Sequence, residues 1–408
     1  MDTEFLARFW ERSAFEAGRD GPPDGFPKLP DLPLGRYTDP LFQALEDEYL
    51  FHRVWLYGVH DSELPKPGSY RLCEIAGAPI LFVRGDDGQV RAFRNACRHR
   101  GAPVVRGDSG SARLLVCQFH SWSYDLRGQL VRVPDERDFV GLQVSERCLP
   151  TVRCERWGGW HFINFDDEAM PLEQWLDPIP RLLPEVATAP LRVIDHKSVP
   201  LGCNWKILAE AFLEVYHART IHPKTVGPSL DTRGTVISLF EHGHQNMLSP
   251  VNRGTRGDRR ELLPMFEGVT ETFRSDIQPA YGIFPNVITP LDARGFPILR
   301  FWPLSINRTR LDITWFAADW GEGEMPAEQR EIWDARLTRF DTVMDEDYEN
   351  LEPIQRSMET AAHGGQVINY QERRIWHVQA WIDKVIGTER IPEHLRVPDL
   401  LEDWVEHP

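Results

Sequence analysis

Two short segments of the chain each combine a cysteine with a histidine. Cys97 and His99 form C-x-H, and seventeen residues later Cys117 and His120 form C-x-x-H. Two thiolates and two imidazoles are a complete set of four protein ligands for one closed metal centre. A run typical of a β-strand lies between the pairs, so we expect each pair on its own hairpin-like turn.

Two kinds of metal centre fit this donor set. Zinc accepts Cys2His2, but its fingers usually open with C-x2-4-C and carry both histidines on one helix. A [2Fe–2S] cluster of the Rieske type binds two cysteines on one iron and two histidines on the other, so each turn can supply one ligand to each iron. Histidine ligation places the potential of such clusters at roughly −150 to +300 mV, so they can accept electrons from a ferredoxin. The pattern favours this cluster, and a zinc-stabilised ligand-binding protein is the non-enzyme alternative.

A second candidate centre lies in the segment NWKILAEAFLEVYHARTIHP. We predict a helix over about 204–221, on which Glu214 and His217 share a face because they are three residues apart. His222 lies five residues beyond His217, which is about 140° away on an ideal helix. Pro223 disfavours helical geometry at His222, so the helix should end there and let His222 turn back toward His217.

A two-histidine site for non-haem iron(II) requires one carboxylate to complete a facial triad. We predict a long helix over about 327–361, and Asp347 falls within its apolar stripe of Phe340, Val343, Leu351 and Ile354. A carboxylate on a buried helix face is costly unless it is paired or bound to a metal. Asp347 is therefore the candidate third ligand, whereas Asp345, Glu346 and Glu349 are expected to be solvated charge.

The elements that must position these residues divide the chain into four parts. Residues 1–50 are predicted to be a helical and Pro/Gly-rich arm that wraps a surface or contacts another subunit, and residues 51–165 a small antiparallel β domain. A linker is expected over 166–190, followed by an α+β domain over 191–408. Its predicted strands are 191–201, 235–242, 244–251, 281–290, 296–304 and 310–320.

Composition narrows the classes of function. The chain has 408 residues and a net charge of −16, which disfavours binding to nucleic acid and to anionic membranes. Its N-terminus is charged and no apolar run is long enough to span a bilayer, so a cytoplasmic protein is expected. The six cysteines are too few for a disulfide framework. The four outside the first metal site are expected to be buried thiols: Cys73, Cys148, Cys154 and Cys203.

CRHRGAPV and CQFHSWSYDLRGQL resemble the Rieske motif of the ring-hydroxylating oxygenases, and NWK, Glu214, His217 and His-Pro resemble the mononuclear iron motif of the same family. The chain resembles their catalytic alpha subunits over nearly its full length. The resemblance implies an α+β architecture: an all-β Rieske domain followed by a catalytic domain of the helix-grip (START/Bet v1-like) type. It also implies a [2Fe–2S] cluster on Cys97, His99, Cys117 and His120, and Fe(II) on His217, His222 and Asp347.

Family membership implies further partners and roles. Electrons would come from NAD(P)H through a separate reductase and ferredoxin, and O2 would hydroxylate an aromatic or other hydrophobic organic substrate at the Fe(II). Oxidative N- or O-demethylation is the alternative reaction. The chain would form a homotrimer, with or without a small beta subunit. Glu214 would connect a histidine of the iron centre with His120 of a neighbouring subunit.

Several finer expectations accompany the resemblance. Ser121 stands where the family usually has glycine, which affects the backbone beside a cluster ligand. Six arginines with one aspartate over 91–113 could steer an acidic ferredoxin, although burial in an interface is an equal alternative. Candidate walls of the substrate pocket are Phe284, Val287 and Phe301, although ordinary core positions are the favoured alternative for all three. Candidate polar contacts are His242, His244 and Arg253, although strand alternation explains the two histidines without a ligand. An aromatic acid, a polycyclic or steroid-like molecule and an N- or O-methyl compound all remain open as substrates.

Overall fold

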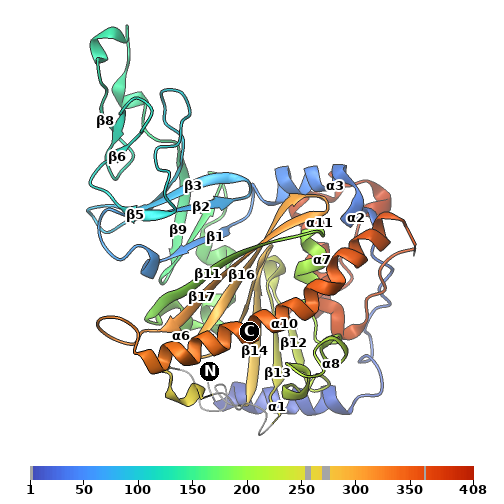
Figure 1. Ribbon diagram of the computed structural model, residues 1–408. Helices are drawn as coiled ribbons and strands as arrows, with labels where there is room; N and C mark the ends of the chain where they lie inside the picture. The colour runs from blue at the N-terminus through green and yellow to red at the C-terminus, as the bar shows by residue number, and fades with distance from the viewer. Residues whose placement is uncertain (1–2, 253–258, 269–275, 363) are drawn as a thin grey trace. The chain divides into compact units, whose positions relative to one another are not determined.

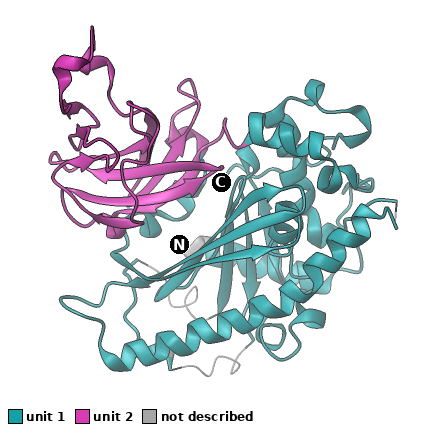
Figure 2. Ribbon diagram, turned by 45° about the horizontal axis from the view of Figure 1, so that its top comes forward, with its two compact units in different colours: residues 1–50, 176–408 teal, residues 51–175 magenta. Residues whose placement is uncertain are grey.

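The computed structural model describes residues 3–252, 259–268, 276–362 and 364–408. The chain forms two compact units, one of residues 51–175 and the other of residues 1–50 together with 176–408 (Figure 2). The first fifty residues therefore share a compact unit with the C-terminal part of the chain. Among the described helices, none has the length and apolar character needed to cross a bilayer.

The unit of residues 51–175 consists of antiparallel β-sheets, as its short apolar runs and turn signals predict. Its larger sheet has the strand order β1-β10-β9-β4-β3-β2-β5. The bounds of these strands are Leu56–His60 (β1), Ser69–Ile75 (β2), Ala78–Arg84 (β3), Val90–Arg94 (β4), Ser109–Ser111 (β5), Thr151–Trp157 (β9) and Trp160–Asn164 (β10). A smaller sheet contains Leu115–Val116 (β6), Ser123–Tyr124 (β7) and Leu130–Arg132 (β8).

The other unit contains a seven-stranded antiparallel sheet in the order β11-β17-β16-β15-β14-β13-β12. The bounds are Leu191–Leu201 (β11), Val236–Leu239 (β12), Gln245–Pro250 (β13), Ile277–Ile283 (β14), Val287–Pro290 (β15), Gly295–Ser305 (β16) and Arg308–Ala318 (β17). The single strand predicted over 281–290 is wrong, because β14 and β15 form a hairpin in which Ile283 pairs with Val287. Pro285, which lacks a backbone N–H, lies in its turn.

Helices accompany this sheet, and the longest, α10 (Ala327–Glu359), runs across it (Figure 1). The helix prediction over 327–361 agrees with α10 to within two residues. Trp315 of β17 packs edge-on against Phe340 of α10, with ring centroids 5.1 Å apart. Among the described residues after 175, the other α-helices are α5 (Ile179–Leu182), α6 (Pro184–Thr188), α7 (Trp205–Glu210), α8 (Ala218–Ile221) and α11 (Arg373–Ile386). In the 51–175 unit, α4 spans Leu172–Trp175.

The N-terminal segment packs on its own chain. It contains α1 (Thr3–Gly18), α2 (Gly35–Thr38) and α3 (Pro40–Leu45). Arg36 is fully buried and donates to Asp383 Oδ1 over 2.6 Å, and the Tyr37 hydroxyl donates to Glu210 Oε1 over 2.7 Å. Buried charges are stable only when they are paired. These bonds therefore stabilise the packing of the N-terminal segment against α7 and α11 of the same unit.

Candidate metal centres

The two Cys/His pairs lie on two similar tight turns in the 51–175 unit. In the first turn, Gly101 N–H donates to Cys97 O over 2.9 Å and Cys97 N–H donates to Ala102 O over 2.8 Å. In the second turn, between β6 and β7, Ser121 N–H donates to Cys117 O and Cys117 N–H donates to Trp122 O, each over 2.9 Å. The shared pattern of bonds explains how two loops distant in sequence present one cysteine and one histidine each.

The cysteines point into a hydrophobic core and the histidines lie at its edge. Cys97 and Cys117 are 3% and 2% exposed, and burial raises the pKa of the Cys97 thiol. The imidazole of His99 stacks on Trp122 and meets that of His120 with ring centroids 4.6 Å apart. His120 is exposed to solvent. A centre held here would be buried on its cysteine side and accessible on its histidine side.

The donor atoms fit a two-iron cluster better than a single ion. His99 Nδ1 is buried without a hydrogen-bond partner among the described residues, as expected of a nitrogen reserved for a metal. Tetrahedral zinc would bring all four donors within about 4 Å of one another. Within the described ranges, however, no three of these donors lie within 4.8 Å of one another. The residues present fit a [2Fe–2S] cluster with one cysteine and one histidine from each turn.

The second candidate centre depends on a break in the helix predicted over 204–221. The structure corrects that prediction: α7 ends at Glu210, residues 211–217 form turns, and α8 begins at Ala218. Glu214 accepts a hydrogen bond from the backbone N–H of His217 over 3.1 Å and another contact from its ring Nδ1. This carboxylate satisfies a free N–H at the start of α8 and so favours the break over a continuous helix. Its closeness to His217 therefore comes from a turn and not from a shared helix face.

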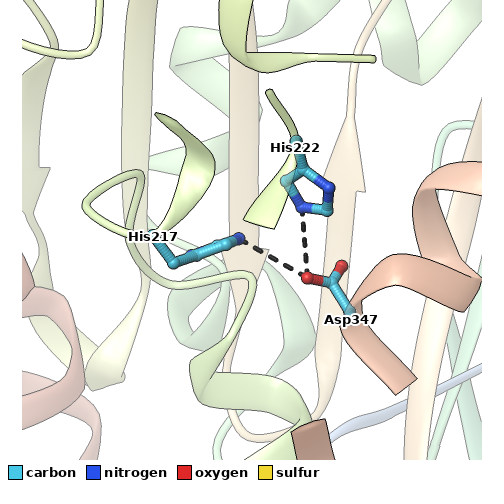
Figure 3. A group of neighbouring side chains, drawn as sticks. All are labelled: His217, His222 and Asp347. Carbon is cyan, nitrogen blue, oxygen red and sulfur yellow. Dashed lines mark ion pairs between the residues drawn. The ribbon is translucent and has the colours of Figure 1, made fainter. Parts of the chain in front are cut away.

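The structure brings His217, His222 and Asp347 together (Figure 3). Asp347 Oδ1 lies 3.6 Å from His217 Nε2 and 3.1 Å from His222 Nε2, and one donor atom from each residue lies within 4.8 Å of the others. His222 is the C-cap residue that follows α8 directly and precedes Pro223, so the helix ends before it as expected. The Asp347 and His222 side chains are 7% and 4% exposed, and that of His217 is 22% exposed. Two imidazole nitrogens and one carboxylate that face a common point are a donor set suited to ferrous iron.

Each imidazole is held by a carboxylate on its other nitrogen. Glu214 contacts His217 Nδ1, and Glu346 Oε2 lies 2.7 Å from His222 Nδ1 and accepts from Thr225 Oγ1 over 2.6 Å. Although burial alone would lower the pKa of each imidazole, the adjacent carboxylates raise the pKa of both His217 and His222. Such partners fix the tautomer and orient the nitrogen that faces the metal.

Glu346 is therefore a site residue that the sequence analysis missed, because it was expected to be solvated charge. Its position one residue before Asp347 turns it about 100° away from the metal, toward His222. A histidine that binds a metal through one ring nitrogen usually needs a hydrogen-bond partner on the other, and this requirement could have pointed to Glu346.

Ile354, which was predicted within the apolar stripe, is 39% exposed.

A cavity of about 310 Å³ opens at the two histidines and Asp347. Its other walls include Phe212, Met247, Ile288, Trp315 and Phe340. The three candidate walls do not line this cavity: Phe284, Val287 and Phe301 are buried core residues, the alternative that the sequence favoured. Alternation explains Val287, because its neighbour Ile288 on β15 lines the cavity instead. Phe284 lies in the turn between β14 and β15. Phe301 lies farther along β16 than the lining residue Pro297, and its ring packs on that of Phe212.

The two histidines predicted as polar contacts do not line this cavity. The His244 ring is fully buried and accepts from Phe284 N–H over 3.1 Å, and His242 packs against Trp381. Arg253 lies outside the described residues.

The arginines near the first centre have mixed environments. Arg91 forms an ion pair with Asp87, and Arg94 packs on the ring of Phe165. Four others are exposed, and none of them makes an ion pair with a described residue: Arg98, Arg100, Arg106 and Arg113. Phe119 lies beside Arg100 and is 53% exposed. Beside the exposed His120, the surface therefore combines the cation of Arg100 with the apolar ring of Phe119.

Comparison with known families assigns both regions. Residues 54–153 match the Rieske [2Fe-2S] domain, and residues 189–388 match the ring hydroxylating alpha subunit (catalytic domain). The first match contains all four residues of the first candidate centre, and the second contains His217, His222 and Asp347.

Similar proteins agree with this assignment. The chain is 27% identical to the oxygenase subunit of glycine betaine monooxygenase from Chromohalobacter salexigens, over 81% of this chain and 80% of the relative. It is 35% identical to the alpha subunit of biphenyl 2,3-dioxygenase from Rhodococcus jostii, over 45% of this chain but only 41% of the relative.

Solved structures show the same fold. A quaternary ammonium Rieske monooxygenase has a TM-score of 0.75 at 21% identity, covering 90% of this chain and 100% of that one. Naphthalene 1,2-dioxygenase from Rhodococcus sp. has a TM-score of 0.74 at 22% identity, covering 95% and 99%. The chain belongs to the Rieske non-haem iron oxygenases, as a catalytic alpha subunit that incorporates oxygen with electrons from partner proteins.

Proposed function

We propose that this chain is a terminal oxygenase that hydroxylates an aromatic or other hydrophobic organic substrate in the cavity beside Asp347. His217, His222 and Asp347 would hold the Fe(II), and Cys97, His99, Cys117 and His120 the [2Fe–2S] cluster. The observation that carries the proposal is the convergence of two imidazoles on one oxygen of a buried carboxylate at the wall of a largely apolar cavity. When bound, the iron supplies O2 activation and the cluster supplies single electrons.

The protein groups around the iron would orient ligands and exclude water. Glu214 and Glu346 hold the two imidazoles with their Nε2 atoms toward Asp347. Phe212, Phe340 and Trp315 provide apolar surface on which an organic substrate can pack. The substrate would thus be positioned by shape and apolar contact, with few polar groups near the reacting carbon.

Electron transfer between the centres would require a second copy of the chain. We propose a homotrimer in which His120 of one subunit approaches Glu214 of the next, as the family resemblance implies. Glu214 supports this role because it already contacts His217 and its side chain is 9% exposed. A head-to-tail contact of this kind closes into a ring. A beta subunit and a cytoplasmic location stay predictions.

The partner that delivers electrons would be an acidic ferredoxin. The exposed Arg98, Arg100, Arg106 and Arg113 lie in the segment that carries Cys97 and His99 or follows it, and would steer such a partner toward the cluster. Charge reversal of Arg100 and Arg113 should weaken the salt dependence of cluster reduction. An unchanged salt dependence would exclude this surface as the docking site.

Anaerobic purification followed by iron analysis and turnover tests the proposal. We expect three iron atoms per chain, a red-brown cluster spectrum, and oxygenated product coupled to NADH consumption with a surrogate reductase and ferredoxin. Formaldehyde release from an N- or O-methyl substrate would instead identify demethylation. Colourless protein that contains zinc would contradict the proposal.

A further inference from the structure

A second cavity, of about 320 Å³, reaches the candidate iron site beside the substrate cavity. Four residues line both cavities: Ala211, Glu214, His217 and Asp347. The second cavity also has a solvent side, because three of its lining residues are exposed: Asn350, Ile354 and Val367. A substrate that fills the first cavity would therefore leave a separate path between solvent and the candidate iron site.

Glu210 is a buried wall residue of this second cavity. It is the last residue of α7 and is 8% exposed. Its Oε1 accepts hydrogen bonds from the Tyr37 hydroxyl and from Gln379 Nε2, each over 2.7 Å. Both donors are uncharged groups, and Glu210 Oε2 forms no hydrogen bond with a described residue. Glu210 thus has one oxygen held by the protein and one that is free to hold a proton.

The charged groups buried near Glu210 are paired without it. Arg36 Nη1 lies 2.6 Å from Asp383 Oδ1, and Lys206 Nζ lies 2.7 Å from Glu46 Oε1. The side chains of both pairs are at most 3% exposed. Glu210 itself contacts uncharged donors and forms no ion pair with a described residue. Each cation already has a carboxylate partner, so an ionised Glu210 would add an unbalanced negative charge to the interior.

The surroundings of Glu210 allow it to titrate near neutral pH. Burial raises the pKa of its carboxyl to about 7, and four neighbours lower that pKa by smaller amounts: Tyr37, Gln379, Lys206 and Arg36. Burial also raises the pKa of Tyr37 well above its ordinary value, so the hydroxyl keeps its proton. The other titratable groups in the wall of the second cavity are Glu214, His217, Asp347 and Glu372.

We infer that Glu210 is a proton relay, which takes protons from solvent in the second cavity and passes them to the iron site. Incorporation of one atom of O2 yields an alcohol and water, incorporation of both yields a diol, and either reaction takes up two electrons and two protons. The partner proteins supply the electrons, whereas the protons come from solvent. Each proton that leaves Oε2 leaves a carboxylate, which solvent protonates again. This inference rests on the proposed function and names the source of its protons.

Infrared spectroscopy of the oxidised, iron-loaded enzyme tests whether Glu210 holds a proton. We expect a carboxylic acid C=O band that disappears as the pH rises through about 7 and that Glu210→Gln lacks at every pH. Tyr37→Phe should move this transition to higher pH, because the Tyr37 hydroxyl lowers the pKa of Glu210. Since Tyr37→Phe keeps the carboxyl, it tests the inference even if Glu210→Gln does not fold. A transition that neither variant changes would overturn the inference.

Turnover of the same holoenzyme tests whether the proton is passed on. We expect Glu210→Gln to lower kcat by about 100-fold, within the contribution typical of a positioned proton donor. Formate, a small acid that fits the second cavity, should restore part of the loss by carrying protons in place of Glu210. A loss that formate leaves unchanged would show a structural role and overturn the inference.

Glu372→Gln is the matched control for this measurement. Glu372 lines the same cavity, and its Oε2 accepts from the Asn369 backbone N–H over 2.9 Å, a contact that glutamine retains. We expect Glu372→Gln to turn over as the parent enzyme does. An equal loss in Glu372→Gln, or no loss in Glu210→Gln, would overturn the assignment of the relay to Glu210.

The same samples separate this inference from the proposed function. If the enzyme contains both iron centres and forms product, but Glu210→Gln turns over like the parent enzyme, the function stands and the inference fails. If Glu210 shows the titrating band but the purified enzyme contains zinc and forms no oxygenated product, Glu210 remains a proton-holding group and the oxygenase proposal fails.

Discussion

The two candidate centres are built in opposite ways. The first has its four proposed ligands within residues 97–120, on two turns of one small β unit, and leaves His120 exposed. The second has its proposed ligands at positions 217, 222 and 347, with the carboxylate on a different helix, and Asp347 is only 7% exposed. One centre is local in sequence and open to solvent, whereas the other is assembled from distant segments and buried.

The difference follows from what each centre must do. A cluster that exchanges electrons with a partner protein needs an accessible edge, and two short turns at the edge of a sheet provide one. A site that activates O2 beside an organic substrate must exclude water, which requires walls from several elements. The contacts that orient the imidazoles also differ: carboxylates contact both imidazoles of the candidate iron site on the nitrogen that faces away from Asp347, whereas the His99 ring stacks on Trp122.

The largest effect is expected from Cys117→Ser. Loss of a buried ligand should remove the cluster spectrum, abolish turnover with ferredoxin and destabilise the β unit, while the mononuclear iron is retained. Cys148→Ser is the control, because Cys148 is only partly buried and bonds Gln129 and Ser145 through its Sγ. Iron analysis and visible spectroscopy measure both outcomes. Loss of all iron in Cys117→Ser would show that the two centres are not independent.

Asp347→Ala should break the second centre alone. We expect turnover to fall by more than about 100-fold, beyond the loss typical of an outer-shell partner, with depleted mononuclear iron and an intact cluster spectrum. Asp345→Ala is the matched control, because Asp345 is exposed on the same helix and does not line the cavity. If the cluster spectrum is lost in Asp347→Ala, the division into two sites is wrong.

Glu346→Gln tests whether the carboxylate partners tune the buried centre. We expect iron affinity to fall by about 10- to 100-fold because His222 loses its charged partner. In the metal-free protein, NMR titration should give a lower pKa for His222, since Glu346 contributes to raising that pKa. Glu349→Gln, on the exposed side of α10, should change neither quantity. If Glu346→Gln binds iron as tightly as the parent protein, the contact of Glu346 with His222 does not tune the iron site.

The smallest effect concerns the open centre and its backbone. Ser121, directly after His120, has a φ of 58°, in the left-handed region that favours glycine. Ser121→Gly should therefore stabilise the β unit by about 0.5 kcal/mol, the relief of strain being partly offset by backbone entropy. Thermal loss of the cluster spectrum measures the change. The control Ser109→Gly, within strand β5, should instead destabilise the β unit. If Ser121→Gly is no more stable than the parent protein, the strain argument is contradicted.

Local patterns in the sequence predicted much of the fold. β11 and α10 agree with their predicted ranges because their apolar periodicity and Pro326 specify them locally. The helix over 204–221 was not predictable, because residues 211–217 have good helical propensity and the break depends on the contact of Glu214 with His217. Glu346 was missed for a different reason: its partner His222 is 124 residues away in sequence, so the contact depends on tertiary packing.

Residue types and spacing were enough to predict both candidate centres, through the Cys/His turns, the His217–His222 pair and Asp347 on the apolar stripe of its helix. Packing was needed to show which carboxylates contact the imidazoles and which strand residues line the cavity. Ligand types are local properties of the chain, whereas the distance between α10 and the sheet depends on packing among segments more than a hundred residues apart.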